Sequence, residues 1–179
     1  MKKQLLVTAL GLLLTASLAH AQLGAGTGTT SVSVAVAAEA ALTAITGTST
    51  LTSSGTNFST YTGTTSLTYF IRTTPTSGSG SIVLKVTTDF APTGGPSVAS
   101  PPTGTDALTY NCTVSSPGTA CTGPLTAKTT ATTSVATFGA DAHSAFAGNS
   151  ASVSWSLTND PVYKVGTYTA TVTFTISAA

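Results

Sequence analysis

The segment Gly166 to Ser177, close to the end of the chain, alternates between apolar and polar side chains at nearly every position. A period of two residues is that of a β-strand with one face against a core and the other in water. The polar face carries five threonines. The apolar face carries Tyr168, Ala170, Val172, Phe174 and Ile176. We therefore expect the chain to close with a strand that covers a hydrophobic core.

Shorter runs of the same kind predict further strands along the chain. They lie at 67–71, 82–86, 108–114, 130–138 and 153–157. A turn signal rich in Pro, Gly and Ser between 75 and 80 predicts that the first two form a hairpin. Trp155 falls at an inward position and is expected in the core. With no long helical pattern, these runs predict an all-β fold, an antiparallel immunoglobulin-like β-sandwich of seven to eight strands.

The first residues have the pattern of an export signal. Lys2 and Lys3 precede a largely apolar run, and Ala19-His20-Ala21 fits the small-x-small rule for cleavage. We expect residues 1–21 to be a signal peptide and the mature chain to begin at Gln22. No later run is apolar for long enough to predict a membrane anchor. The expected location is therefore secreted, either extracellular or on a bacterial cell surface.

The mature chain is expected to begin with a flexible, Gly- and Thr-rich lead over residues 22–30, followed by a strand over 31–45 and a β-sandwich body over 46–179. One face of that strand carries Val32, Val34, Val36 and Leu42. The strand can pair within its own sandwich, or it can be donated to a neighbouring copy by β-augmentation. Its Ala-rich half, residues 37–44, also has the propensity for a short helical turn.

Two cysteines, Cys112 and Cys121, remain after export. In an oxidising compartment, a pair this close in sequence predicts a disulfide. The segment between them contains Ser116-Pro117-Gly118, which is a turn signal. A redox-active pair is the weaker interpretation, because such pairs usually have C-x-x-C spacing and a strand-helix context.

Charge is scarce, since charged residues make up 6% of the chain and the expected mature part has four basic and five acidic side chains. A surface of this kind disfavours nucleic acid as a partner, because such binding needs many Lys or Arg. The pattern predicts no catalytic, metal-binding or cofactor-binding residues. His143, with Asp141 nearby, is the one histidine of the mature part and is interpreted as a polar loop residue, because no nucleophile can be assigned to it. We therefore expect a protein that is not an enzyme and has no cofactor.

The closing strand, Gly166 to Ser177, together with Val153-Ser-Trp-Ser-Leu157 before it, resembles the C-terminus of small secreted bacterial β-sandwich surface proteins. These include pilin-like and spore-coat-U-like filament subunits. The resemblance covers the signal peptide, the N-terminal strand and the last two strands. It implies an immunoglobulin-like fold and assembly by strand exchange. The two mid-chain cysteines depart from the pattern of pilins that use a chaperone and usher.

These features together predict a structural subunit of a bacterial extracellular filament or surface layer. Assembly would proceed through donation of the N-terminal strand, so the expected partner is another copy of the chain. The alternative is a monomeric secreted immunoglobulin-like module for binding or adhesion. It would contact a glycan or another surface ligand through the loops Pro92–Thr105 and Gly139–Asn149.

Overall fold

A computed structural model describes residues 27–179 of the chain. The predicted signal peptide and the first part of the predicted flexible lead lie outside these residues. The chain divides into a leading unit that ends at Val34 and a compact body, Ala35–Ala179. All regular secondary structure in the described part is β-strand, which confirms the predicted all-β class.

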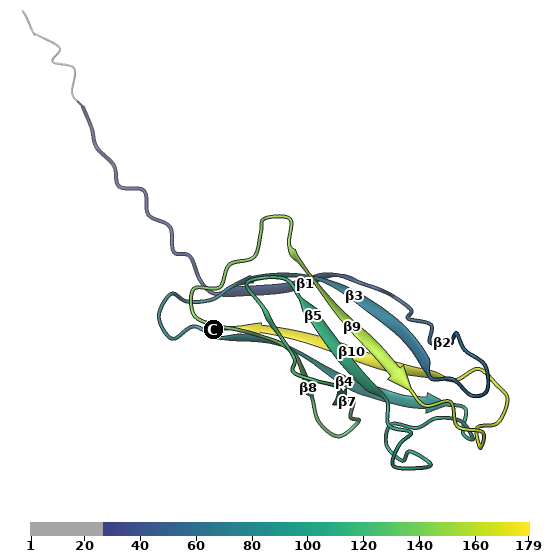
Figure 1. Cartoon of the computed structure of the whole chain (residues 1–179). Helices are drawn as coiled ribbons and strands as arrows, with labels where there is room; N and C mark the ends of the chain where they lie inside the picture. The colour runs from purple at the N-terminus through teal and green to yellow at the C-terminus, as the bar shows by residue number, and fades with distance from the viewer. Residues whose placement is uncertain (1–26) are drawn as a thin grey trace, which may run out of the picture. The chain divides into compact units, whose positions relative to one another are not determined.

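The body is formed by two antiparallel sheets in separate layers (Figure 1). The strands are β1 Glu39–Ile45, β2 Thr52–Ser53, β3 Tyr61–Arg72, β4 Gly80–Ala91, β5 Thr109–Val114, β6 Thr119–Ala120, β7 Leu125–Thr126, β8 Thr133–Phe138, β9 Asn149–Leu157 and β10 Thr169–Ala178. The first sheet has the order β1-β3-β9-β5-β7, with β2 also paired to β3. The second has the order β10-β4-β8-β6. The longer strands fall where the apolar alternation predicts them.

The hydrophobic core lies between the two sheets. Its centre is built from the inward rows of β3, β4 and β9, which are fully buried. The residues of these rows are Leu67, Tyr69 and Ile71; Ile82, Leu84 and Val86; and Ala151, Val153, Trp155 and Leu157. Trp155 is buried as predicted, and its indole N–H donates a 2.8 Å hydrogen bond to Oγ1 of the buried Thr65.

The predicted hairpin between β3 and β4 is wrong, because the two strands belong to different sheets. Their connection, residues 73–79, crosses from one layer to the other. Thr73 is buried in this crossing, and Thr74 N donates a hydrogen bond to Ala179 O at the end of β10. The apolar residues of the two strands therefore face one another across the core. Alternation identified both strands correctly but carries no information about which neighbour each strand pairs with.

Hydroxyl side chains line the outer face of the first sheet where β3 pairs with β9. The outward positions of β9 are all serines, and those of β3 opposite them are threonines or serine. The paired residues are Thr62 and Ser156, Thr64 and Ser154, Ser66 and Ser152, and Thr68 and Ser150. This part of the face has no charged side chain, so its contact with water depends on hydroxyl groups.

A disulfide joins the two sheets along one side of the body. Cys112 lies on β5 in the first sheet, and Cys121 directly follows β6 in the second. The intervening turn closes with a hydrogen bond from Gly118 N to Ser115 O. The predicted disulfide and turn are therefore confirmed. The opposite side of the body, formed by β1 and β10, has no such covalent link.

The strand registers define two ends of the body. The proximal end holds Glu39, Arg72 and Gly80, where β1 and β4 begin and β3 ends. The distal end holds Tyr61 and Ala91, where β3 begins and β4 ends. The twelve residues of β4 separate the two ends by roughly 36 Å at the usual rise per residue.

Removal of the disulfide should destabilise the body without changing its strand pairing. The bond closes a short loop, with a sequence separation of 9 residues, so the chain-entropy estimate gives about 2–3 kcal/mol. We expect the double variant Cys112→Ser, Cys121→Ser to have a free energy of unfolding lower by that amount, and therefore to unfold at a lower denaturant concentration. Chemical unfolding followed by Trp155 fluorescence measures this loss. A reducing agent should shift the parent protein in the same direction and leave the double variant unchanged.

Candidate functional site

The start of the body is fixed by the length of β3. β1 pairs with β3 from Glu39, which lies opposite Arg72, the last residue of β3. Residues 27–38, which we call the leading residues, have no assigned secondary structure, whereas the sequence predicted one strand over 31–45. The Ala-rich half of that predicted strand, residues 37–44, therefore lies mostly in β1 and does not form a helical turn. Leu42 is half-buried and packs against the core of its own body.

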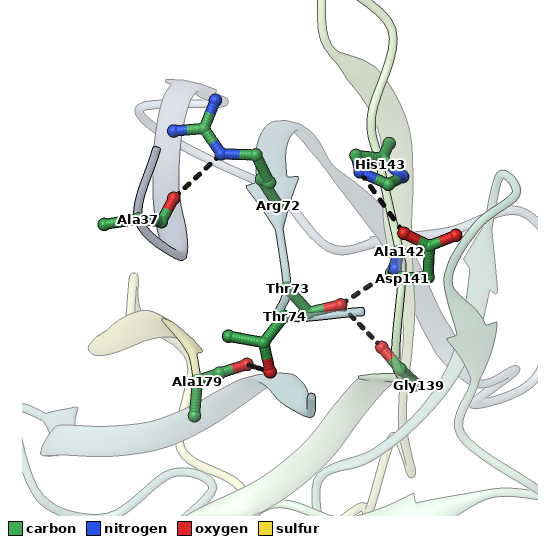
Figure 2. A network of polar contacts seen from close by, with 9 residues as sticks. All are labelled: Ala37, Arg72, Thr73, Thr74, Gly139, Asp141, Ala142, His143 and Ala179. Atoms are coloured by element: carbon green, nitrogen blue, oxygen red, sulfur yellow. Dashed lines mark hydrogen bonds and ion pairs between the residues drawn. The ribbon is translucent and has the colours of Figure 1, made fainter. Parts of the chain in front are cut away.

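Arg72 and Thr73 tie the segments at the proximal end together (Figure 2). The Arg72 side chain donates a 2.8 Å hydrogen bond from Nε to Ala37 O and forms a 3.0 Å ion pair with Glu39. Thr73 Oγ1 donates to Gly139 O and accepts from Ala142 N, each over 2.8 Å. These contacts fix the position at which the leading residues join the body.

Three valines of the leading residues remain exposed. The exposed fractions are 93% for Val32, 84% for Val34 and 65% for Val36. They alternate with small or polar residues, so an extended chain places all three on one face. Leu42 is separated from them, because it lies in β1. The described structure thus divides the four residues predicted as an assembly interface into three exposed valines and one half-buried leucine that packs against the core.

The last strand, β10, forms an edge of the second sheet and pairs on one side only, with β4. Natural edge strands are usually protected by charged side chains, by proline or by bulges. β10 has no charged residue and no proline. Its pairing with β4 is irregular between Thr169 and Val172 but regular from Val172 to Ala178. This part of the edge is available to pair with another strand.

The inward row of β10 is less buried than those of the strands around it. Its residues are Ala170, Val172, Phe174, Ile176 and Ala178, and each is only half-buried. The inward row of β4, its partner strand, is fully buried from Ile82 to Val86. Half-buried Ala40 and Leu42 of β1 border the same side of the core. An apolar strip is therefore left partly open to solvent where β1 and β10 adjoin.

The two loops predicted to bind a partner lie at opposite ends of the body. The loop Pro92–Thr105 follows β4 at the distal end, whereas Gly139–Asn149 follows β8 at the proximal end. They therefore do not form one compact site, and contact with a partner through these loops stays a prediction for each loop separately. Sequence alternation locates loops but does not tell which end of a sandwich each one occupies.

A recess of about 550 Å³ lies at the distal end. Its walls come from the loop after β4 and from the segment before β10. The lining includes Phe90, Pro96, Pro102, Val162, Tyr163 and Lys164. Polar residues also line it, namely Asp89, Thr93, Ser97 and Ser100, so the recess has a mixed surface with one cationic side chain, Lys164.

Asp89 organises the loop that forms one wall of this recess. Its carboxylate accepts hydrogen bonds from Phe90 N, Ser97 Oγ, Val98 N and Ala99 N over 2.6–3.1 Å. Burial raises the pKa of this carboxyl, but the four hydrogen bonds together outweigh it and hold the pKa below its usual value. The charged form of Asp89 therefore stabilises the folded loop.

Few other ionisable side chains lie close together in the described residues. His143 lies exposed in the loop Gly139–Asn149, with Nε2 3.6 Å from Oδ1 of Asp141. In residues 27–179 no group of three His, Cys, Asp or Glu side chains lies together. No helix in this range is long and apolar enough to cross a membrane.

Some functional features leave no signal in the sequence. The Arg72 contacts join residues more than thirty positions apart, and a lone arginine does not indicate its partner. The four hydrogen bonds to Asp89 depend on the path of the following loop. The unprotected edge does have a signal, because the absence of charge and proline from the final strand is visible in the sequence.

No family model, curated protein or solved structure matches this chain.

The contribution of Asp89 to stability should disappear in acid. Because its pKa is lowered by folding, its stabilisation is complete above the unfolded pKa of 3.8 and is lost as the pH falls through the lower folded pKa. We expect Asp89→Asn to cost about 1–3 kcal/mol at neutral pH, the range for a hydrogen-bonded charge.

Denaturant unfolding of the parent protein and of Asp89→Asn between pH 2 and 7 measures the difference in their free energies of unfolding. It should be constant above about pH 5 and shrink toward zero below the folded pKa. Asp141→Asn, at an exposed position, is the matched control and should differ little from the parent at every pH. A difference for Asp89→Asn that does not change with pH would contradict the assignment.

Proposed function

We propose that the mature chain is a structural subunit of a bacterial extracellular filament or surface layer. Its leading residues would be donated to a neighbouring copy and would pair with the free edge of β10 there. The body would then be an immunoglobulin-like sandwich that is completed in trans. The sequence resemblance to pilin-like and spore-coat-U-like surface subunits supports the same function.

The observation that carries this proposal is the combination of an unpaired apolar segment with an unpaired apolar edge. Val32, Val34 and Val36 are exposed, and their spacing of two residues places them on one face when the segment is extended. β10 offers a free edge and a half-buried apolar row. Large side chains of this kind gain free energy when they leave water, and edge backbone groups gain partners when a strand is added.

Burial of the three valines would contribute free energy to the contact. Burial of a valine side chain is worth about 1.5–3 kcal/mol, so three give on the order of 5–9 kcal/mol before the cost of ordering the segment. Backbone hydrogen bonds to β10 would set direction and register. The low charge of the mature chain leaves little electrostatic repulsion to oppose close packing of many copies.

The direction of pairing determines whether the assembly closes. β10 runs from the distal to the proximal end, and the leading residues join the body at the proximal end. Antiparallel pairing with β10 then brings the proximal end of the donor to the distal end of the acceptor. This contact joins two different surfaces, so it repeats without closing and produces a linear polymer.

Assembly should depend on the face of the donated segment that carries the valines. In the mature chain, residues 22–179, we expect Val34→Asp to abolish filaments, because a charge would have to be buried beside the apolar row of β10. The matched control is Ser33→Asp, which adds the same charge on the opposite face and should still assemble. Negative-stain microscopy and light scattering after size exclusion measure both variants.

A second variant tests the same proposal without adding charge. Deletion of residues 22–38 removes the donated segment but keeps β1 and the core, so the body should remain folded, soluble and monomeric. A synthetic peptide of residues 30–38 should bind this shortened body. Polymerisation of the shortened protein, or equal assembly of Val34→Asp and Ser33→Asp, would show that strand donation is not the mechanism.

The second candidate function is a monomeric binding or adhesion module for a glycan or another surface ligand. The distal recess supports it, because Phe90, Tyr163 and Lys164 line a concave site of suitable size for a small ligand. This candidate keeps the loop Pro92–Thr105 and leaves out the proximal loop. A parent protein that stays monomeric at all concentrations and gives a glycan-array signal would favour it over the filament.

A further inference from the structure

The leading residues have a fixed point of attachment to their own body. Arg72 Nε donates a 2.8 Å hydrogen bond to Ala37 O (Figure 2), and the guanidinium also forms an ion pair with Glu39, the first residue of β1. Val36 directly precedes this attachment, and its side chain is exposed. It is therefore the last large apolar side chain of the leading residues that can be donated to a neighbouring copy.

The free edge of β10 also has a defined beginning. The pairing of β10 with β4 shifts between Thr169 and Thr171 and again between Thr171 and Val172, and β4 supplies the extra residue each time. Bulges of this kind increase the local twist of a sheet. From Val172 to Ala178 the pairing is regular. An added strand therefore finds an evenly aligned edge from Val172 onward.

The two faces of the added strand limit the possible registers. Residues directly opposite each other in an antiparallel pair share one face of the sheet, and a slip of one residue exchanges the faces. The valines lie at even positions of the chain, and so does the inward row of β10. Registers that turn the valines toward the core therefore differ from one another in steps of two residues.

A shift of the donor toward the C-terminus of β10 is opposed by the Arg72 contact. With Val36 opposite Phe174, Ala38 would have to pair with Val172 of the neighbour. The chain is already bound to its own body at Ala37, so Ala38 is not free to do this.

A shift in the other direction gives a poorer match of side chains. With Val36 opposite Ala170, the donor would extend into the bulged part of the pairing between β10 and β4. The polar Thr30 would then lie opposite Ile176, which is half-buried at the border of the core. The register between these two avoids both conflicts.

We propose that strand donation occurs in this one register and that Arg72 sets it. The opposing pairs are Val36 with Val172, Val34 with Phe174, and Val32 with Ile176 of the neighbouring copy. Each large apolar residue of the regular edge then lies beside one valine, and pairs of β-branched and aromatic residues across strands are favourable. Arg72 acts as a positioning residue, because its hold on Ala37 O determines where the donated segment ends. This inference rests on the proposed function and adds the partner of each donated residue.

Cysteine pairs on the outer face test the register. The proposed register places Ser33 opposite Thr175. Directly opposed Cα atoms are about 4.5–5.5 Å apart, which a disulfide can span, whereas diagonal neighbours two residues away lie at roughly 7–8 Å, at or beyond its limit. The parent has no free cysteine, so only the added thiols can be newly oxidised.

We expect oxidised filaments of the mature chain with Ser33→Cys and Thr175→Cys to give a covalent ladder on a non-reducing denaturing gel. The matched controls combine Ser33→Cys with Thr173→Cys or with Ser177→Cys, and each should give several-fold less ladder. Ser33→Cys alone should give no species larger than a dimer. Negative-stain microscopy before oxidation shows whether each variant has assembled.

Replacement of Arg72 tests its role as the positioning residue. Arg72→Ala releases Ala37 O, so the register can shift by two residues and the ladder from the Ser33 and Ser177 pair should rise several-fold. Glu39→Gln removes the ion pair but keeps the hydrogen bond from Nε, and it should leave the parent pattern unchanged. Trp155 fluorescence checks that both variants remain folded.

The outcomes separate the register from strand donation itself. Filaments that cross-link best through Thr173 or Ser177 while Arg72 is present would overturn the register but not the donation. Filaments whose ladder does not change with Arg72→Ala would overturn the role of Arg72. Absence of both filaments and ladders from every pair would overturn strand donation, and the register with it.

Discussion

The packing of two apolar layers against each other is the interaction on which the rest of this molecule depends. β3 and β4 are consecutive in sequence, yet their connection carries the chain from one sheet to the other. Their apolar rows therefore become opposing walls of one core. The disulfide Cys112–Cys121 secures the layers on one side. On the other side β1 is short, β10 has no charged residue or proline, and the apolar row of β10 is only half-buried.

This asymmetry explains why the two ends of the chain matter most for the proposed function. The leading residues cannot extend β1, because β3 has ended and offers no further backbone partner. Arg72 fixes the point where they join the body. Within one molecule, neither the valines of the leading residues nor the apolar row of β10 is fully removed from water. Pairing between copies would remove both sets of apolar side chains from water in a single step.

Alternation along the chain was sufficient to predict the all-β class, the longer strands and the buried Trp155, and the spacing of the two cysteines was sufficient to predict the disulfide. Each of these depends on local pattern or on separation in sequence. The partner of each strand depends on contacts far apart in sequence, which explains why a hairpin was predicted for β3 and β4. Complete burial of Asp106 was equally invisible, because Asp in a turn is normally exposed. The absence of charge and proline from β10 is visible in the sequence, but its position at the edge of a sheet is not.

The outer face formed by β3 and β9 carries hydroxyl groups and, across its paired Thr and Ser rows, no charged side chains. Dissolved ions weaken attraction and repulsion between charges, but they have little effect on hydrogen bonds from hydroxyl groups to water. The hydration of this face should therefore depend little on ionic strength in the range where salt acts mainly by screening charge.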